Sequence, residues 1–210
     1  FGGSALGGAV NVVTKEYPPV YFDFTYEVGS FNTHQVSTVF KRTDRKSGLQ
    51  FGIGGAFSFA KNDYKMKLAN LDGREVKRDH DQFNKIMAGM SLKATKWWFD
   101  EMKWELIFLK TRQEIQGIDL DIREAYNRSI SGVTALTLKR KNFFVDGLDF
   151  DFEIGYVIGK YGLRDKAMNR YDWDGNKLPP VSPFGGEQNN FPSDGRNRSN
   201  ELTSMLNMGY

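Results

Sequence analysis

The sequence predicts an all-β fold in which about eight antiparallel strands form part of a transmembrane β-barrel. Three observations lead to this prediction. Apolar and polar residues alternate with a period of two through successive runs of the chain. Most runs are about ten residues long, which is the length of a tilted strand that crosses a bilayer. Short and long polar connections alternate between the runs, which is typical of such barrels.

The first four runs lie at residues 20–28, 35–41, 49–59 and 85–93, and each places apolar side chains on one face of a strand. The opposite face is polar or small, and it carries Asp23, Glu27 and Lys85. The apolar positions are Val20, Phe22, Phe24, Tyr26 and Val28, then Val36, Thr38 and Phe40, then Leu49, Phe51, Ile53, Gly55, Phe57 and Phe59, and then Ile86, Ala88, Met90 and Leu92.

The last four runs lie at residues 100–111, 134–140, 148–159 and 202–208. Ile107 and Leu109 blur the alternation in the fifth run, and the sixth run is weak. The apolar positions are Met102, Trp104, Leu106 and Phe108, then Leu136 and Leu138, then Leu148, Phe150, Phe152, Ile154, Tyr156 and Ile158, and then Leu202, Leu206 and Met208.

Asp149, Asp151 and Glu153 share one face of the seventh run. Neighbouring carboxylates can perform acid–base chemistry or bind a cation. A water-filled lumen face with basic partners on adjacent strands also accounts for them, and it is the interpretation we favour. No catalytic residues and no metal ligands are assigned, and the chain is not expected to be an enzyme.

The connections separate into two classes. Those at 43–48, 95–101 and 142–147 are short, and those at 62–81, 112–132 and 162–200 are long and polar, while 30–32 is a short exception. Short turns of outer-membrane barrels face the periplasm and long loops face outside. Aromatic residues suit both interfaces, with Trp97, Trp98 and Phe99 at a short turn.

Composition excludes several classes of function. The 210 residues include no cysteine, which rules out disulfides and thiol catalysis, and the only histidines are His34 and His80. The net charge of +3 comes without a long Lys/Arg stripe, so no nucleic-acid partner is expected. The chain starts at Phe1 and shows no signal peptide, so a fragment of a longer protein is expected.

The connection at 162–200 is the best candidate for external ligand contacts, because long loops are usually functional or disordered. It combines aromatic and cationic side chains, namely Arg164, Arg170, Tyr171, Trp173 and Arg196. Such residues are common in recognition sites, although they also serve loops that only pack on other loops. Within it, Asp172, Asp174 and Asn176 resemble the start of a calcium loop, but a plain hairpin tip is favoured.

The first fifteen residues carry a glycine-rich motif, FGGSALGGAVNVVTK. Glycine allows positive φ and close backbone approach, so Gly2, Gly7 and Gly8 suggest tight packing, and Asn11 lies in a short strand that follows. This motif resembles the end of the plug domain of TonB-dependent outer-membrane receptors, in which the barrel strands begin just after it. The resemblance divides the chain into residues 1–16, the C-terminal end of a plug, and 17–210, the N-terminal part of a transmembrane β-barrel.

The resemblance also implies a function and a location. A receptor of this family lies in the bacterial outer membrane, binds a scarce ligand such as a siderophore, haem or cobalamin, and imports it with TonB-supplied energy. The expected partners are therefore outer-membrane lipid, an unknown small-molecule or metal-chelate ligand, and the TonB complex through a region absent from this chain. No cofactor is expected. Two alternatives stay open: a passive or adhesive outer-membrane barrel, and a soluble β-rich binding module.

Overall fold

The computed structural model describes residues 17–180, 182–188 and 191–210. The plug expectation for residues 1–16, including Gly2, Gly7, Gly8 and Asn11, lies outside the described residues. The described chain is all-β, apart from a single-turn 3-10 helix, η1 (Ala69–Leu71). Because both the alternation and the aromatic content favour extended backbone, strands dominate as the sequence predicted.

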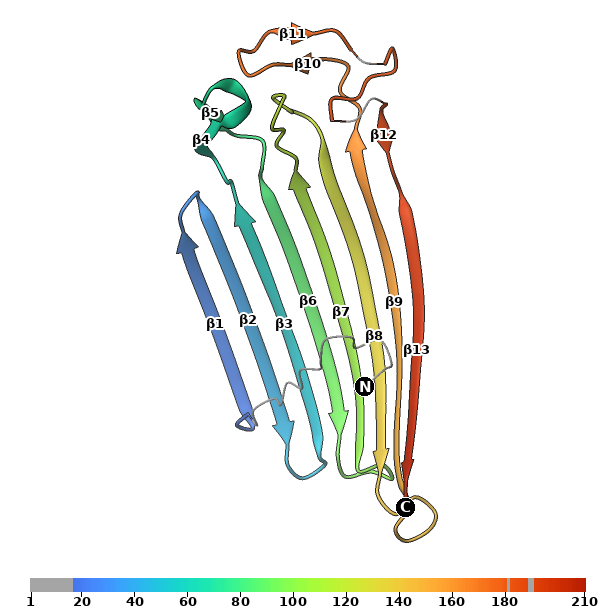
Figure 1. Cartoon of the computed structure of the whole chain (residues 1–210). Helices are drawn as coiled ribbons and strands as arrows, with labels where there is room; N and C mark the ends of the chain where they lie inside the picture. Colours follow the sequence, from blue (N-terminus) through green and yellow to red (C-terminus); the bar gives the residue numbers. More distant parts are fainter. Residues whose placement is uncertain (1–16, 181, 189–190) are drawn as a thin grey trace.

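Eight long strands form one antiparallel sheet in the order β1-β2-β3-β6-β7-β8-β9-β13 (Figure 1). Each strand pairs with the next long strand along the chain, so the sheet is a meander. The strands are β1 (Val20–Gly29), β2 (Thr33–Asp44), β3 (Leu49–Ala60), β6 (Phe83–Ala94), β7 (Glu101–Glu114), β8 (Tyr126–Arg140), β9 (Asp149–Asp165) and β13 (Asn197–Gly209).

Small elements fill the long connections. The hairpin β4 (Tyr64–Leu68) and β5 (Arg74–Arg78) lies between β3 and β6. The pair β10 (Arg170–Tyr171) and β11 (Lys177–Leu178) lies between β9 and β13, and β12 (Ser193–Asp194) pairs with the end of β9. The sequence had indicated no strands in these connections, since pieces this short show little alternation.

The two classes of connection lie at opposite ends of the sheet, as expected from the antiparallel order (Figure 1). The short turns at 45–48, 95–100 and 141–148 share one end. Gly48 and Gly147 adopt positive φ values of 72° and 88° in two of these turns, a region that glycine enters without strain. The other end carries the connections at 61–82, 115–125 and 166–196, together with the tight turn at 30–32.

The pairing register separates the sheet into an apolar and a polar face. Side chains directly opposite each other in antiparallel strands point to the same face. Thus Phe24 of β1 shares a face with Thr38, Gly55, Ala88 and Phe108. The polar face carries ion pairs between neighbouring residues, listed here with N–O distances: Lys93–Glu101 at 2.6 Å, Lys103–Glu105 at 2.9 Å and Lys139–Asp151 at 3.3 Å.

Four strands run further toward the long connections than the alternation predicted. β7 continues to Glu114, β8 begins at Tyr126 rather than Thr134, β9 continues to Asp165, and β13 begins at Asn197. In these extensions many residues of both faces are polar, so the apolar–polar period is lost while backbone pairing continues. The connections are correspondingly shorter than expected.

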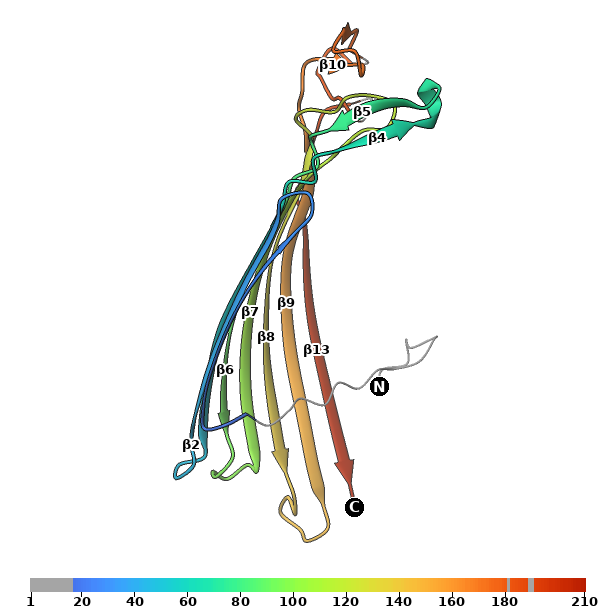
Figure 2. The ribbon, with the colours of Figure 1, turned by 90° about the vertical axis from the view of Figure 1, so that its left-hand side faces the viewer.

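The sheet is open in the part of the chain that the structure describes. There β1 pairs only with β2, and β13 pairs only with β9. Figure 2 shows the sheet nearly edge-on, as one curved layer with the long connections gathered at one end. The fold is therefore an antiparallel sheet with two free edges, and it does not close into a barrel in these residues.

Candidate functional site

The three long connections contact one another at one end of the sheet, and we refer to their described residues within 61–82, 115–125 and 166–196 as the loop cluster. Arg74 of β5 forms an ion pair with Asp174 at 2.8 Å and donates a hydrogen bond to the carbonyl of Trp173 at 2.9 Å. The Trp173 indole donates to the carbonyl of Ile118 at 2.9 Å. Trp173, from the connection at 166–196, therefore contacts both of the other connections.

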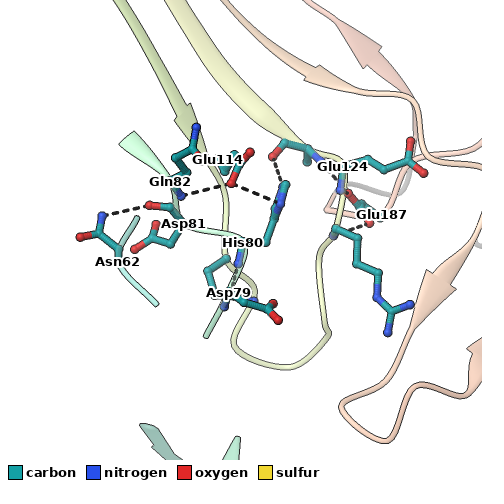
Figure 3. Close-up of polar contacts among 11 residues, drawn as sticks. Asn62, Asp79, His80, Asp81, Gln82, Glu114, Glu124 and Glu187 are labelled. Atoms are coloured by element: carbon teal, nitrogen blue, oxygen red, sulfur yellow. Dashed lines mark hydrogen bonds and ion pairs between the residues drawn. The ribbon is translucent and has the colours of Figure 1, made fainter. Parts of the chain in front are cut away.

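Two buried carboxylates anchor the base of the loop cluster. Glu187 is 3% exposed and accepts backbone N–H bonds from Arg123, Glu124 and Ala125 at 2.9, 2.5 and 2.6 Å (Figure 3). Asp165, at the end of β9, is fully buried and accepts the backbone N–H groups of Glu187 and Gln188. A carboxylate that accepts several N–H groups is well satisfied even when it is buried. These contacts bind 166–196 to 115–125.

His80 links the β5–β6 connection to β7 and to the start of β8 (Figure 3). Its Nε2 lies 3.0 Å from the carbonyl oxygen of Ala125 and its Nδ1 lies 3.5 Å from Glu114. Glu114 also accepts the backbone N–H of Gln82. The carbonyl can only accept, so Nε2 carries the proton in this bond.

The tip of the loop cluster is the compact turn between β10 and β11, and the Arg123 guanidinium stacks on the Tyr171 ring beside it. Asp172 accepts hydrogen bonds from the backbone of Asp174 and from both the backbone and the side chain of Asn176. These bonds, led by the Asn176 side chain, hold the pKa of Asp172 below its usual value. The carboxylate thus closes the turn between β10 and β11, which agrees with a hairpin tip. The Arg123 guanidinium lies 3.9 Å from the centroid of the Tyr171 ring.

A second cationic group surrounds Asp194 at the base of the long connection. Arg128 lies 2.8 Å from this carboxylate, Lys166 lies 3.1 Å away and Arg196 lies 3.8 Å away. The hydrogen bond from Lys166, followed by the charges of Lys166, Arg128 and Arg196, lowers the pKa of Asp194. One carboxylate faces three cations, so the group keeps a net positive charge.

The five candidate ligand residues from the sequence fall into two separate groups. Tyr171 and Trp173 lie at the tip, and Arg170 precedes them in β10 with its Nε buried and without a hydrogen-bond partner among the described residues. Arg196 lies at the base, near Asp194. Arg164 is not in the connection, because it is part of β9 and is paired with Asp194 and Tyr126 in the backbone register.

Several residues that build the loop cluster were not singled out from the sequence. Arg74, His80, Asp165 and Glu187 act through partners more than twenty residues away, so no local pattern marks them. Arg123 has distant partners too, beside its ion pair with Asp121. For example, 64 residues separate Glu187 from Arg123. The aromatic and cationic composition of 162–200 was the only signal, and it carried no information about these contacts.

Among the hollows outside the loop cluster, two lie away from the short turns. One, of about 400 Å³, lies on the polar face toward the loop cluster and is lined in part by Thr111, Gln113, Asn127, Ser129 and Tyr161. Thr111 and Ser129 share a 2.6 Å hydrogen bond there. The other, of about 310 Å³, is lined by small residues such as Gly52, Gly54 and Gly89 in the middle of the sheet.

In the described ranges, no three His, Cys, Asp or Glu side chains are grouped so that they could hold a metal ion. The same ranges contain no helix of sufficient length and hydrophobicity to span a membrane. Comparisons with family models, curated proteins and solved structures found no match. The functional argument therefore depends on the residues themselves.

Proposed function

We propose that this chain is part of a TonB-dependent outer-membrane receptor that binds a scarce external ligand, such as a siderophore, haem or cobalamin, and imports it with TonB-supplied energy. The observation that carries the proposal is the exposed apolar face of the sheet. Phe22, Ile53 and Leu206 are 66%, 49% and 55% exposed, although a soluble sheet would bury such side chains in a core. An exposed apolar face of this kind is suited to contact with lipid.

Two polar groups in the apolar band of this face have hydrogen-bond partners, which supports the same proposal. The Trp104 indole donates to Thr134 Oγ1 at 2.9 Å, and the Thr38 hydroxyl donates to the carbonyl of Asp23 at 3.1 Å. A bilayer offers no water to such groups, so they need partners within the protein. Trp104 and Thr38 therefore meet the chemical requirement for contact with hydrocarbon.

Aromatic residues gather at the ends of the sheet, as interfaces favour. At the short-turn end, Trp98 packs against Phe99, Phe143 and Phe144, with ring centroids 4.6 to 5.9 Å apart. At the opposite end, Phe31 packs against Tyr64 at 5.0 Å. Aromatic clusters at both ends are consistent with two membrane interfaces, with the hydrocarbon layer between them.

The loop cluster and the opening motif support a receptor over a passive barrel. Contacts between distant connections hold Tyr171 and Trp173 in place, which lowers the entropy lost when a ligand binds. The glycine-rich motif at residues 1–15 supports a plug and therefore energy coupling. A barrel that only lets solutes diffuse needs neither an ordered loop cluster nor a plug, so both features favour a receptor.

Energy-dependent uptake tests the proposal. The full-length natural protein is expressed in a Gram-negative host that lacks its own high-affinity uptake systems, and cells receive ferric siderophores, haem or cobalamin in separate assays. We expect accumulation of one ligand class that stops when an uncoupler dissipates the proton-motive force. Accumulation that is insensitive to the uncoupler would indicate a passive barrel. A natural protein that stays monodisperse without detergent would overturn the membrane assignment.

Ligand capture by the loop tip is tested with a triple variant, Arg170→Ala, Tyr171→Ala and Trp173→Ala. We expect it to lower uptake while surface abundance stays normal, because the tip lies outside the eight long strands. The matched control is Phe184→Ala with Phe191→Ala, because these exposed aromatics belong to the same connection but form none of the tip contacts described above. Equal uptake by the two variants would move recognition to other residues.

A further inference from the structure

Five cations lie together on the apolar face, where the apolar band ends toward the loop cluster. We call them the basic rim: Lys110, Arg112, Arg128, Lys160 and Arg198. Lys110 follows Phe108 by two residues in β7, and Lys160 follows Ile158 by two residues in β9, so each shares the face of its apolar neighbour. The register places Arg128 and Arg198 on this same face.

The basic rim contains two pairs of like charges in direct register. Arg112 of β7 lies opposite Arg128 of β8, and Lys160 of β9 lies opposite Arg198 of β13. Directly opposite like charges destabilise a sheet. Within the described residues, no salt bridge engages Lys110, Arg112, Lys160 or Arg198, and Arg128 shares Asp194 with two other cations. The basic rim therefore carries positive charge that the ion pairs described above do not neutralise, which favours an anionic partner.

The location of the basic rim identifies the chemistry of that negative charge. On these strands the cations lie directly beside apolar side chains that the proposed function places in hydrocarbon. A soluble ligand would instead meet the loop cluster or the polar face. We propose that the basic rim is a binding site for the phosphate groups of anionic lipid in the outward-facing leaflet. This inference rests on the membrane orientation of the proposed function.

Side-chain geometry suits such an occupant. The Arg112 guanidinium lies 4.0 Å from the centroid of the Tyr126 ring, which fixes its position and leaves donors for a phosphate. Guanidinium groups match phosphate oxygens with two parallel hydrogen bonds, and ammonium groups add point charge. Lys110, Arg112, Lys160 and Arg198 are all exposed, so a headgroup can reach them.

Lipid binding by full-length protein tests the proposal. The protein is titrated in dodecyl maltoside micelles with fluorescent phosphatidylglycerol, with phosphatidylcholine as the lipid of zero net charge. The test variant combines Lys110→Gln, Arg112→Gln, Lys160→Gln and Arg198→Gln, and it keeps Arg128 because this residue holds Asp194. The control variant combines Lys67→Gln, Lys77→Gln, Lys85→Gln and Lys177→Gln, which removes the same charge away from the apolar face.

We expect wild type and control to bind phosphatidylglycerol at least tenfold more tightly than the test variant, because each basic residue near a charged lipid surface contributes to binding. Unchanged affinity in the test variant, or an equal loss in the control, would overturn the proposal. Displacement of the lipid by millimolar inorganic phosphate would also overturn it, in favour of a free-phosphate site. Circular dichroism spectra serve as a control, and they should show the same strand content in both variants as in wild type.

These outcomes are separate from those of the uptake assay. The titration contains no transported ligand, so lipid binding without uptake would refute transport alone. If ligand uptake is observed but the test variant binds lipid as tightly as wild type, only the lipid-binding role of the basic rim is refuted.

Discussion

Glu187 holds two loops together with a single buried side chain, because its carboxylate accepts three successive backbone N–H groups. Removing it takes the acceptor away from a buried N–H group, that of Ala125, and from two part-buried ones, those of Arg123 and Glu124. Hydrogen bonds to a charged group contribute about 1.5–3 kcal/mol each when measured by mutation. The residue therefore controls local stability more than any ion pair on the loop surface does.

We predict that Glu187→Ala loosens the loop cluster without unfolding the sheet. The free energy of local opening at residues 123–125, measured by hydrogen exchange, should fall by about 2–3 kcal/mol. Glu124→Ala is the matched control, since it removes an exposed carboxylate from the same segment. Equal protection in the two variants would show that Glu187 is not the anchor.

Asp194 gives the base of the loop cluster a pH dependence. Its pKa is lowered in the folded protein by Lys166, Arg128 and Arg196, so the carboxylate contributes stability above its ordinary pKa of about 3.9. That contribution is lost as the pH falls through the lower, folded pKa. We expect proteolysis within 166–196 to accelerate only below about pH 4. The variant Asp194→Asn should be cleaved faster than wild type at pH 7, and the difference should shrink as the pH falls below about 4. A difference that stays constant as the pH falls would refute this.

At the scale of the strand, the two faces of β1 provide a direct test of orientation. Phe24 lies on the apolar face and is 60% exposed, while Thr25 lies on the polar face. Phe24→Arg should destabilise membrane insertion by about 2–4 kcal/mol if the residue is near the bilayer midplane. Thr25→Arg should cost much less, because the proposed orientation turns that face toward water. Equal losses in refolding titrations into lipid vesicles would contradict the assigned faces.

The strands were predictable from the sequence wherever one face is apolar. Residues 20–28 and 49–59 alternate clearly, and β1 and β3 cover them. Tyr126 to Val133 could not be recognised as part of β8, because both of its faces carry polar residues and only pairing with β7 and β9 defines it. The composition of 162–200 suggested a candidate site, but the contacts of Glu187 and Arg74 depend on distant loops and have no local signature.

At the scale of the molecule, the two free edges of the sheet determine how this chain behaves by itself. The outer backbone groups of β1 and β13 have no strand beside them in the described residues. Unpaired edges join other chains readily. We predict that residues 1–210 alone, in detergent, form oligomers whose mass exceeds one chain by light scattering. A monodisperse monomer with full strand content would show that the edges are satisfied within the chain.

Because the strands differ in length, they end at different heights on the side of the sheet that carries the long connections. β1 has 10 residues and β9 has 17, and Figure 1 shows β8 and β9 ending beyond β1 and β2. At about 3.3 Å per residue, β9 is longer by roughly 20 Å. In the proposed outer-membrane orientation, antibodies or phages outside the cell would reach the connection after β9 before they reach the turn at 30–32. Selection by them would act on residues 166–196, while the low corner at 30–32 would be sheltered.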